Sequence, residues 1–113
     1  MSIIAIVELS SFSKKAAKIL DKEEIGALRA YLLQHPDKGD VIPGTGGIRK
    51  LRWAASGRGK RGGARVIYFY HVVGTTVYLM GCYAKNEQTD LSSADKKHLK
   101  SLTVQIKKGD KHV

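Results

Sequence analysis

The segment that most constrains the fold is a pair of apolar runs, ARVIYFYHVV and VYLMGCYA, joined by the short turn GTT. The first run is β-branched or aromatic at most positions and apolar on both of its alternating faces. A strand that is apolar on both faces is typical of the interior of a sheet. The tight turn brings the second run back beside the first as a β-hairpin. The sequence therefore predicts a sheet with this hairpin near its centre.

The remaining elements follow from hydrophobic spacing and capping signals. The β-branched run Ile3–Val7 predicts a strand. Apolar residues at helical spacing predict a helix over Phe12–Leu20. Asp21 and Glu24 have the form of a capping box that opens a second helix, KEEIGALRAYLLQ. We expect a final helix from about Ser92 to Lys107, with Leu99, Leu102 and Ile106 on its apolar face.

Between the second helix and the hairpin, the stretch IRKLRW alternates and predicts another strand. Leu51 and Trp53 share the face that is expected to point into the core. Lys50 and Arg52 therefore lie together on the opposite face. The resulting order is β-α-α-β-β-β-α. We expect a single α+β domain over residues 1–113, with two N-terminal helices and one C-terminal helix.

Charge is distributed very unevenly along the chain. The sequence has 20 Lys and Arg residues against 10 Asp and Glu residues, a net charge of +10. Residues 41–86 contain no acidic residue, and their cations are Arg49, Lys50, Arg52, Arg58, Lys60, Arg61, Arg65 and Lys85. Concentrated like charge on a folded surface costs self-repulsion. We therefore expect a polyanionic partner, with nucleic acid ranked first, an acidic protein segment second and a membrane surface third.

Several other classes of protein are disfavoured. No run approaches membrane-spanning length, and the N-terminus lacks the features of a signal peptide, so we expect a cytoplasmic protein without a membrane partner. The single cysteine, Cys82, lies in an apolar run and is expected to be buried. No zinc-ligand pattern is present, and we expect neither a metal nor another cofactor.

The loop GRGKRGG carries three of the cations on a glycine-rich backbone. It lacks the P-loop pattern and does not open a helix, which argues against a mononucleotide or dinucleotide site. Glycine allows the backbone to approach a phosphate closely. Arg58, Lys60 and Arg61 on such a loop can close over a polyanion. A solvated loop with incidental charge is the alternative interpretation.

Four cations are expected to converge at one end of the sheet: Lys50, Arg52, Arg65 and Lys85. Arg65 begins one hairpin strand and Lys85 follows the other, so antiparallel pairing brings them close. Protection of a sheet edge against aggregation is the alternative, and it suits Lys50 and Arg52 better than the hairpin residues. A phosphodiester would relieve the repulsion among the four. Tyr83 shares a face with Lys85 and could stack on a base or exchange a proton.

Such a site has the chemistry to cleave RNA through the RNA's own 2′-OH. That reaction needs a group to take the 2′-OH proton, a group to stabilise the phosphorane and a group to protonate the leaving 5′-oxygen. Arginine is a good phosphate clamp, and a lysine crowded by cations could exchange protons. The basic segment has no carboxylate cluster, which disfavours a two-metal nuclease.

Three stretches together resemble the RelE/HigB family of bacterial type II toxins, and most of all its HigB branch: GIRKLRW, GKRGGARVIY and YAKNE. The resemblance covers about residues 40–105. It implies a small twisted antiparallel sheet packed by helices. It also implies a metal-independent mRNA endoribonuclease that works in the ribosomal A site, and a cognate antitoxin of the helix-turn-helix, HigA-like kind. In such proteins the catalytic groups would match Lys50, Arg52, Arg65 and Lys85.

We therefore expect a translation-inhibiting toxin that cuts mRNA on the ribosome. Its catalytic residues are expected to be Lys50, Arg52, Arg65, Lys85 and Tyr83, and its RNA contacts Arg49, Arg58, Lys60, Arg61 and Asn86. The stretch NEQTDLSSADKKH lacks the tyrosine that some family members carry there. The general base is therefore expected to be either Tyr83 or a lysine. A ParE-like toxin acting on DNA gyrase and a non-catalytic nucleic-acid-binding protein are the alternative functions.

Overall fold

A computed structural model describes residues 5–53, 63–84 and 91–109, and the structural statements below refer to these residues. The helices and strands follow in the order β1 (Ala5–Glu8), α1 (Ser10–Ile19), α2 (Lys22–Gln34), β2 (Asp40–Val41), β3 (Ile48–Trp53), β4 (Ala64–His71), β5 (Thr76–Ala84) and α3 (Ser93–Gly109). The predicted α+β class and the predicted helices are confirmed. The two-residue strand β2 is an addition, because its polar, glycine-containing surroundings carry no strand pattern.

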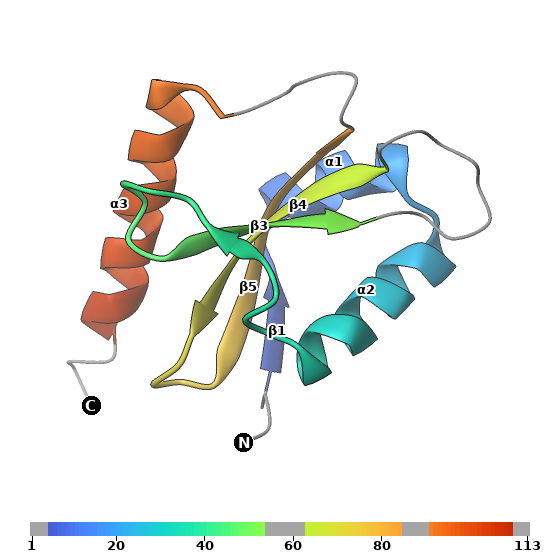
Figure 1. The fold of residues 1–113 in the computed structure, drawn as a ribbon, viewed down its shortest axis with the longest axis horizontal. Coiled ribbons are helices and arrows are strands. Elements are labelled where there is room, and N and C mark those ends of the chain that lie inside the picture. The colour runs from blue at the N-terminus through green and yellow to red at the C-terminus, as the bar shows by residue number, and fades with distance from the viewer. Residues whose placement is uncertain (1–4, 54–62, 85–90, 110–113) are drawn as a thin grey trace.

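The strands form one sheet in the order β1-β5-β4-β3-β2, with β4 at its centre as predicted (Figure 1). The pairs β2–β3, β3–β4 and β4–β5 are antiparallel. The pair β1–β5 is parallel, so the sheet is not antiparallel throughout. A hydrophobic pattern identifies a strand but does not fix its direction or its partner, and β1 and β5 are far apart in the sequence, with α1, α2 and the other three strands between them.

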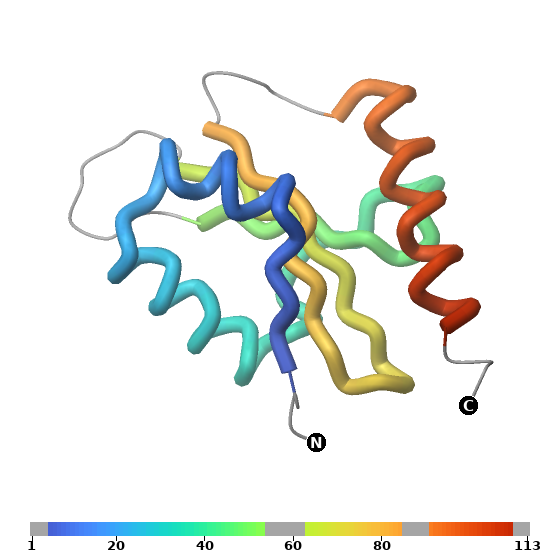
Figure 2. Tube along the Cα trace, turned by 180° about the vertical axis from the view of Figure 1, so that it is seen from behind, coloured from blue at the N-terminus to red at the C-terminus, as the bar shows by residue number. Residues whose placement is uncertain are grey.

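Helices cover both faces of the sheet. In Figure 1, α3 lies on one side of the sheet and α2 on the other; seen from behind in Figure 2, α1 runs across β5. Leu51, Val66 and Leu79 pack with α1 and α2, while Ile48, Ile67 and Phe69 pack with α3. Among the helices that the structure describes, none is long and apolar enough to cross a membrane.

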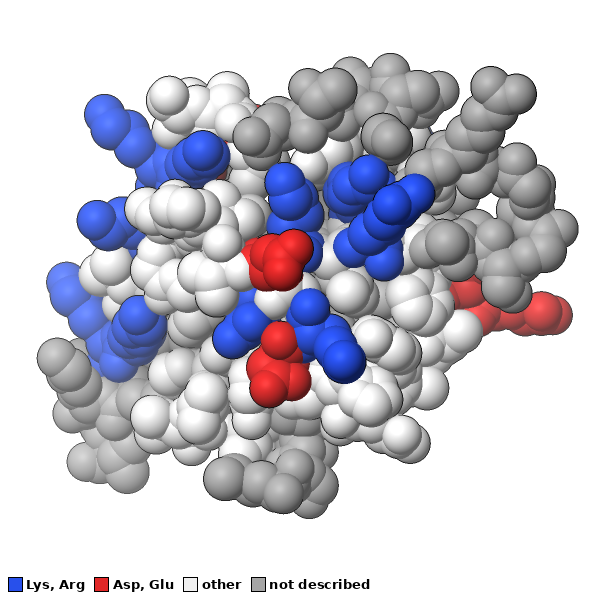
Figure 3. Space-filling view, in the orientation of Figure 1, with Lys and Arg blue, Asp and Glu red and all other residues white. Residues whose placement is uncertain are grey.

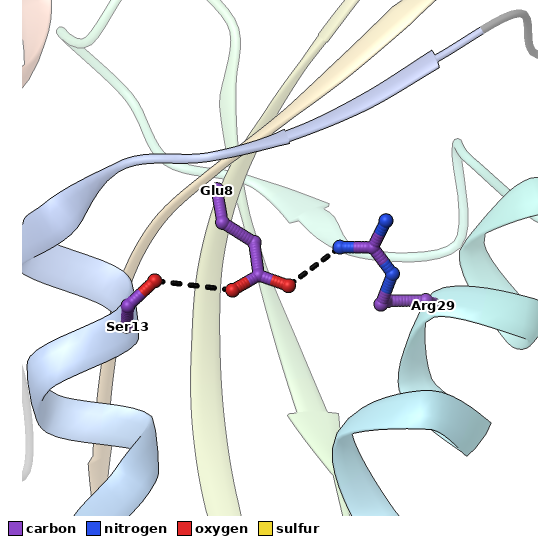
Figure 4. A network of polar contacts seen from close by, with 3 residues as sticks. All are labelled: Glu8, Ser13 and Arg29. Carbon is purple, nitrogen blue, oxygen red and sulfur yellow. Dashed lines mark hydrogen bonds and ion pairs between the residues drawn. The ribbon is translucent and has the colours of Figure 1, made fainter. Parts of the chain in front are cut away.

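Local sequence signals explain where the N-terminal helices begin and how they are held. The predicted capping box is present: the Glu24 N–H donates to Asp21 Oδ1, and the Asp21 N–H donates to Glu24 Oε1, both at 2.8 Å. Glu8, at the end of β1, accepts hydrogen bonds from Ser13 on α1 and Arg29 on α2 (Figure 4). One carboxylate thus ties together the first three elements.

Helix α3 is fastened to the turn between β2 and β3. Thr103 Oγ1 donates to the carbonyl oxygen of Thr45 at 3.1 Å, and Lys107 Nζ donates to that of Gly46 at 3.0 Å. Gly46 has a φ of +81°, and a Cβ there would lie 2.7 Å from Thr103 Oγ1. Glycine is therefore required by both the backbone conformation and the close approach of the helix.

Candidate nucleic-acid interface

Three of the predicted site residues form a row across the sheet near the end of β3. Arg52 lies directly opposite Arg65 on β4, and Arg65 lies directly opposite Tyr83 on β5. Directly opposed residues of an antiparallel pair share a face and have Cβ atoms about 4.5–5.5 Å apart. We call Arg52, Arg65 and Tyr83 the transverse row. It lies on the face that α3 covers further along the strands.

The transverse row contains two arginines at directly opposed backbone positions, with their side chains on the same face. Like charges directly opposite one another destabilise an antiparallel pair. Arg52 is exposed and makes no hydrogen bond or ion pair with the part of the chain that the structure describes, while Arg65 is half-buried. A phosphate between the two arginines would remove the repulsion and could accept paired N–H donors from each.

Lys50 adds a further cation to this face, and a carboxylate stands beside it. Lys50 is two residues before Arg52 on the same strand, and Asp40 on β2 lies directly opposite Lys50. Basic side chains gather over the middle of the face shown in Figure 3, with acidic side chains between them. Sequence reasoning missed Asp40, because it precedes the acid-free segment and only the pairing of β2 with β3 brings it to Lys50.

Tyr83 reaches the row because β5 contains a bulge. Ile67 pairs with Gly81 and Tyr68 with Leu79, so Met80 is the extra residue between them. The bulge changes which face successive residues occupy. Cys82 therefore packs with α1 and α2, buried as predicted, whereas Tyr83 packs on the α3 face. Tyr83 has an exposed fraction of 6%, so its neighbours hold the side chain in place, and its backbone position lies directly opposite Arg65.

Arg49 is not part of this arrangement. It lies on the other face of β3, where its Nη1 donates to the carbonyl oxygens of Asp37 at 3.0 Å and Gly39 at 2.7 Å. The facing Tyr68 hydroxyl donates to the Pro36 carbonyl at 2.8 Å and accepts from the Gly39 N–H at 2.9 Å. Arg49 and Tyr68 thus hold the turn after α2, and the structure does not bring Arg49 to the transverse row.

The buried Tyr68 hydroxyl in this turn has a shifted pKa. Burial of the Tyr68 hydroxyl raises its pKa above the ordinary value of 10.0, although the hydrogen bond from Gly39 opposes that rise. The Tyr68 hydroxyl therefore stays protonated at neutral pH.

The other predicted site residues lie outside the described residues. These are Arg58, Lys60 and Arg61 of the glycine-rich loop, and Lys85 and Asn86 after β5. In the sequence, the glycine-rich loop lies between Trp53 at the end of β3 and Ala64 at the start of β4, and Lys85 follows Ala84 at the end of β5. Ala64 is directly paired with both Trp53 and Ala84. Both segments therefore join the sheet at the end where the transverse row lies.

Comparison with known proteins gives the family. Residues 6–112 match the family described as the RelE toxin of the RelE / RelB toxin-antitoxin system. This chain belongs to the RelE toxin family. A solved structure of the E. coli toxin RelE, a double arginine-to-alanine variant in the free state, matches with a TM-score of 0.57. The two sequences are 15% identical, and the match covers 79% of this chain and 90% of that chain.

The fold and the role of this chain rest on different comparisons, the fold on the solved structure and the role on the family match. The structural match shows that this RelE-family chain has the RelE fold, which agrees with the predicted α+β class, a small sheet packed by two N-terminal helices and one C-terminal helix. The family match makes the chain a toxin of a toxin-antitoxin system and implies a cognate antitoxin as its partner.

Proposed function

We propose that this RelE-family toxin is an endoribonuclease that cuts mRNA on the ribosome and thereby inhibits translation. The observation that carries the proposal is the direct opposition of Arg52 and Arg65, with Tyr83 next in the same row. A row of this kind is suited to bind one phosphodiester and to supply a proton-exchanging group beside it. Lys50, on the same face, adds positive charge to the site.

The chemistry divides among the residues as follows. Arg52 and Arg65 hold the scissile phosphate and stabilise the negative charge that builds up on the phosphorane. The 2′-oxygen attacks phosphorus while its proton passes to a base, and the 5′-oxygen leaves with a proton from an acid. Tyr83 is one candidate for proton exchange, because its backbone position lies directly opposite Arg65 and its side chain packs on the same face of the sheet. A lysine of the basic segment is the other candidate.

The basic segments next to the row would extend the contact with RNA. Arg58, Lys60 and Arg61, with Lys85 and Asn86, are proposed to contact the mRNA backbone on either side of the scissile phosphate. Contacts of this kind position the strand without reading its sequence. An antitoxin that covers the row with acidic side chains would neutralise the toxin, and a helix-turn-helix, HigA-like partner is the proposed type.

Induction in bacterial cells tests the proposal. We expect the wild-type chain to arrest growth and to introduce new 5′ ends in translated mRNAs, but not in a matched mRNA without a start codon. Arg65→Ala should reduce cleavage by about 100-fold or more, as expected when a transition-state donor is lost. Lys14→Ala, an exposed change on α1, is the matched control and should behave as wild type. DNA damage with intact mRNA would contradict the proposal and favour a gyrase-directed toxin.

A further inference from the structure

A pocket of about 220 Å³ opens beside the transverse row, between α1, β5 and α3. It exists because β1 ends at Glu8, so no strand covers the edge of the second half of β5. Helix α1 passes along this edge instead, and Ser11 Oγ donates to the carbonyl oxygen of Met80 at 2.6 Å. The first turns of α3 close the pocket from the other side.

The pocket has an apolar interior and a polar rim. Its interior is lined by Ile67, Met80, Leu99 and Leu102. Lys15 and His98 lie at the rim, and both are exposed. Neither makes a hydrogen bond or ion pair with the described part of the chain. The pocket therefore offers an apolar surface together with a lysine donor and an imidazole that can donate or accept.

The other polar groups at the rim are already engaged. The Ser11 hydroxyl is bonded to Met80, and Asp95 caps α3 by accepting from the Ser92 N–H at 3.2 Å. In return the Asp95 N–H donates to Ser92 Oγ at 3.1 Å. A ligand with carbonyl acceptors and a flat apolar body fits what remains. At this volume the pocket is below the usual size of drug-like sites, about 300–1,000 Å³, and suits a single ring system.

Tyr83 joins the pocket to the transverse row. Its side chain lines the pocket, and its backbone position lies directly opposite Arg65. Neighbouring strands are about 4.7–4.9 Å apart. The backbone at Tyr83 is therefore about 10 Å across the sheet from the backbone at Arg52. An extended single strand of RNA with a phosphate on the arginines can place a nearby base in the pocket.

We propose that this pocket binds one nucleobase of the RNA strand that the transverse row holds. The proposal rests on the proposed function of the row as an RNA-phosphate site, and it adds a contact that depends on the base. Tyr83 forms the shared wall, and Lys15 and His98 bond to the edge of the base. The pocket, rather than the arginines, would then contribute to the choice of the nucleotide beside the cut.

Binding of short 2′-O-methyl oligonucleotides tests this proposal, because these strands cannot be cleaved through a 2′-OH. The affinity is measured for an intact strand and for strands in which one position at a time is abasic. With the wild-type chain, we expect removal of one particular base to weaken binding by about 5- to 100-fold, the usual size of a stacked-base contribution. Equal affinity for every strand would overturn the proposal.

Two kinds of variant test whether the loss of affinity on removal of one base arises in this pocket. Gly81 lines the pocket, and a Cβ there would make only an ordinary 3.7 Å contact with Ile67, so Gly81→Leu should fold while narrowing the pocket. The double variant Lys15→Ala, His98→Ala removes only exposed groups. Both should bind the intact strand as weakly as the abasic one. The double variant Lys14→Ala, Lys97→Ala changes exposed side chains of the same helices and should keep the wild-type preference.

The outcomes separate this proposal from the proposed function. Arg52→Ala should weaken binding of intact and abasic strands equally, and it should reduce the dependence of binding on salt. Both pocket variants should remove only the part of the affinity that depends on the base, and Gly81→Leu, which changes no charge, should leave the salt dependence unchanged. If Gly81→Leu and the Lys15, His98 double variant keep the preference for the intact strand, the pocket proposal is wrong even where the row binds RNA.

Discussion

Arg65 and Tyr83 lie directly opposite each other on β4 and β5, so the proposed phosphate-binding group and the proposed proton-exchanging group start from neighbouring backbone positions. Tyr83→Phe keeps the packed ring and removes only the hydroxyl. If Tyr83 exchanges the proton, cleavage should fall by about 100-fold or more while RNA affinity is unchanged. Tyr78→Phe, on the same face of β5, is the control. Full cleavage by Tyr83→Phe would leave a lysine as the proton-exchanging group.

Arg49→Ala should affect stability rather than RNA binding. The change removes the donors to the carbonyl oxygens of Asp37 and Gly39, and we expect unfolding to become easier by about 1–3 kcal/mol. Urea denaturation measures the loss, and RNA affinity measured under folding conditions should stay near the wild-type value. Arg52→Ala should show the reverse pattern. A stable Arg49→Ala variant with weakened RNA binding would assign Arg49 to the interface after all.

Tyr68 should make the protein sensitive to high pH. Its pKa is raised above 10.0 by burial, so the folded state keeps the phenolic proton that the unfolded state loses. The contribution is complete below pH 10.0 and is lost as pH rises through the folded-state pKa. The free energy of unfolding should therefore fall above about pH 10 in the wild type. Tyr68→Phe should be less stable at neutral pH and should lack this alkaline decline.

Gly46→Ala should weaken the attachment of α3. A methyl group at this position would lie 2.7 Å from Thr103 Oγ1, in addition to the unfavourable φ of +81°. Gly44→Ala is a matched control, because Gly44 has a φ of +80° but no atom within 4 Å of the added Cβ. Urea denaturation should show Gly46→Ala to be less stable than Gly44→Ala by about 1–3 kcal/mol, the usual cost of overpacking. Equal stability would mean that the turn and helix separate easily.

Much of the fold could be predicted because local signals agree with one another. The Asp21–Glu24 capping box fixes the start of α2, and the apolar run of β4 places that strand at the centre of the sheet. Alternation in β3 correctly separates Lys50 and Arg52 from Leu51 and Trp53. These features depend on residues close together in the sequence, so the sequence pattern is sufficient to identify them.

The features that escaped prediction depend on long-range pairing. The parallel pairing of β1 with β5 and the position of Asp40 beside Lys50 follow from which strands become neighbours. The bulge at Met80 reverses the alternation along β5. Gly81 beside it is a local signal of a bulge, but a glycine alone does not show which residue is the extra one. The pocket beside Tyr83 arises only where α1, β5 and α3 meet.

The most direct test of the central claim is cleavage, on purified translating ribosomes, of an mRNA that carries a single 2′-deoxy nucleotide at the position of the cut. If the transverse row activates attack by the RNA's own 2′-OH, the all-ribose mRNA should be cut to give a 2′,3′-cyclic phosphate end. The 2′-deoxy mRNA should stay intact at that position. Cleavage of both mRNAs at the same rate would contradict the account.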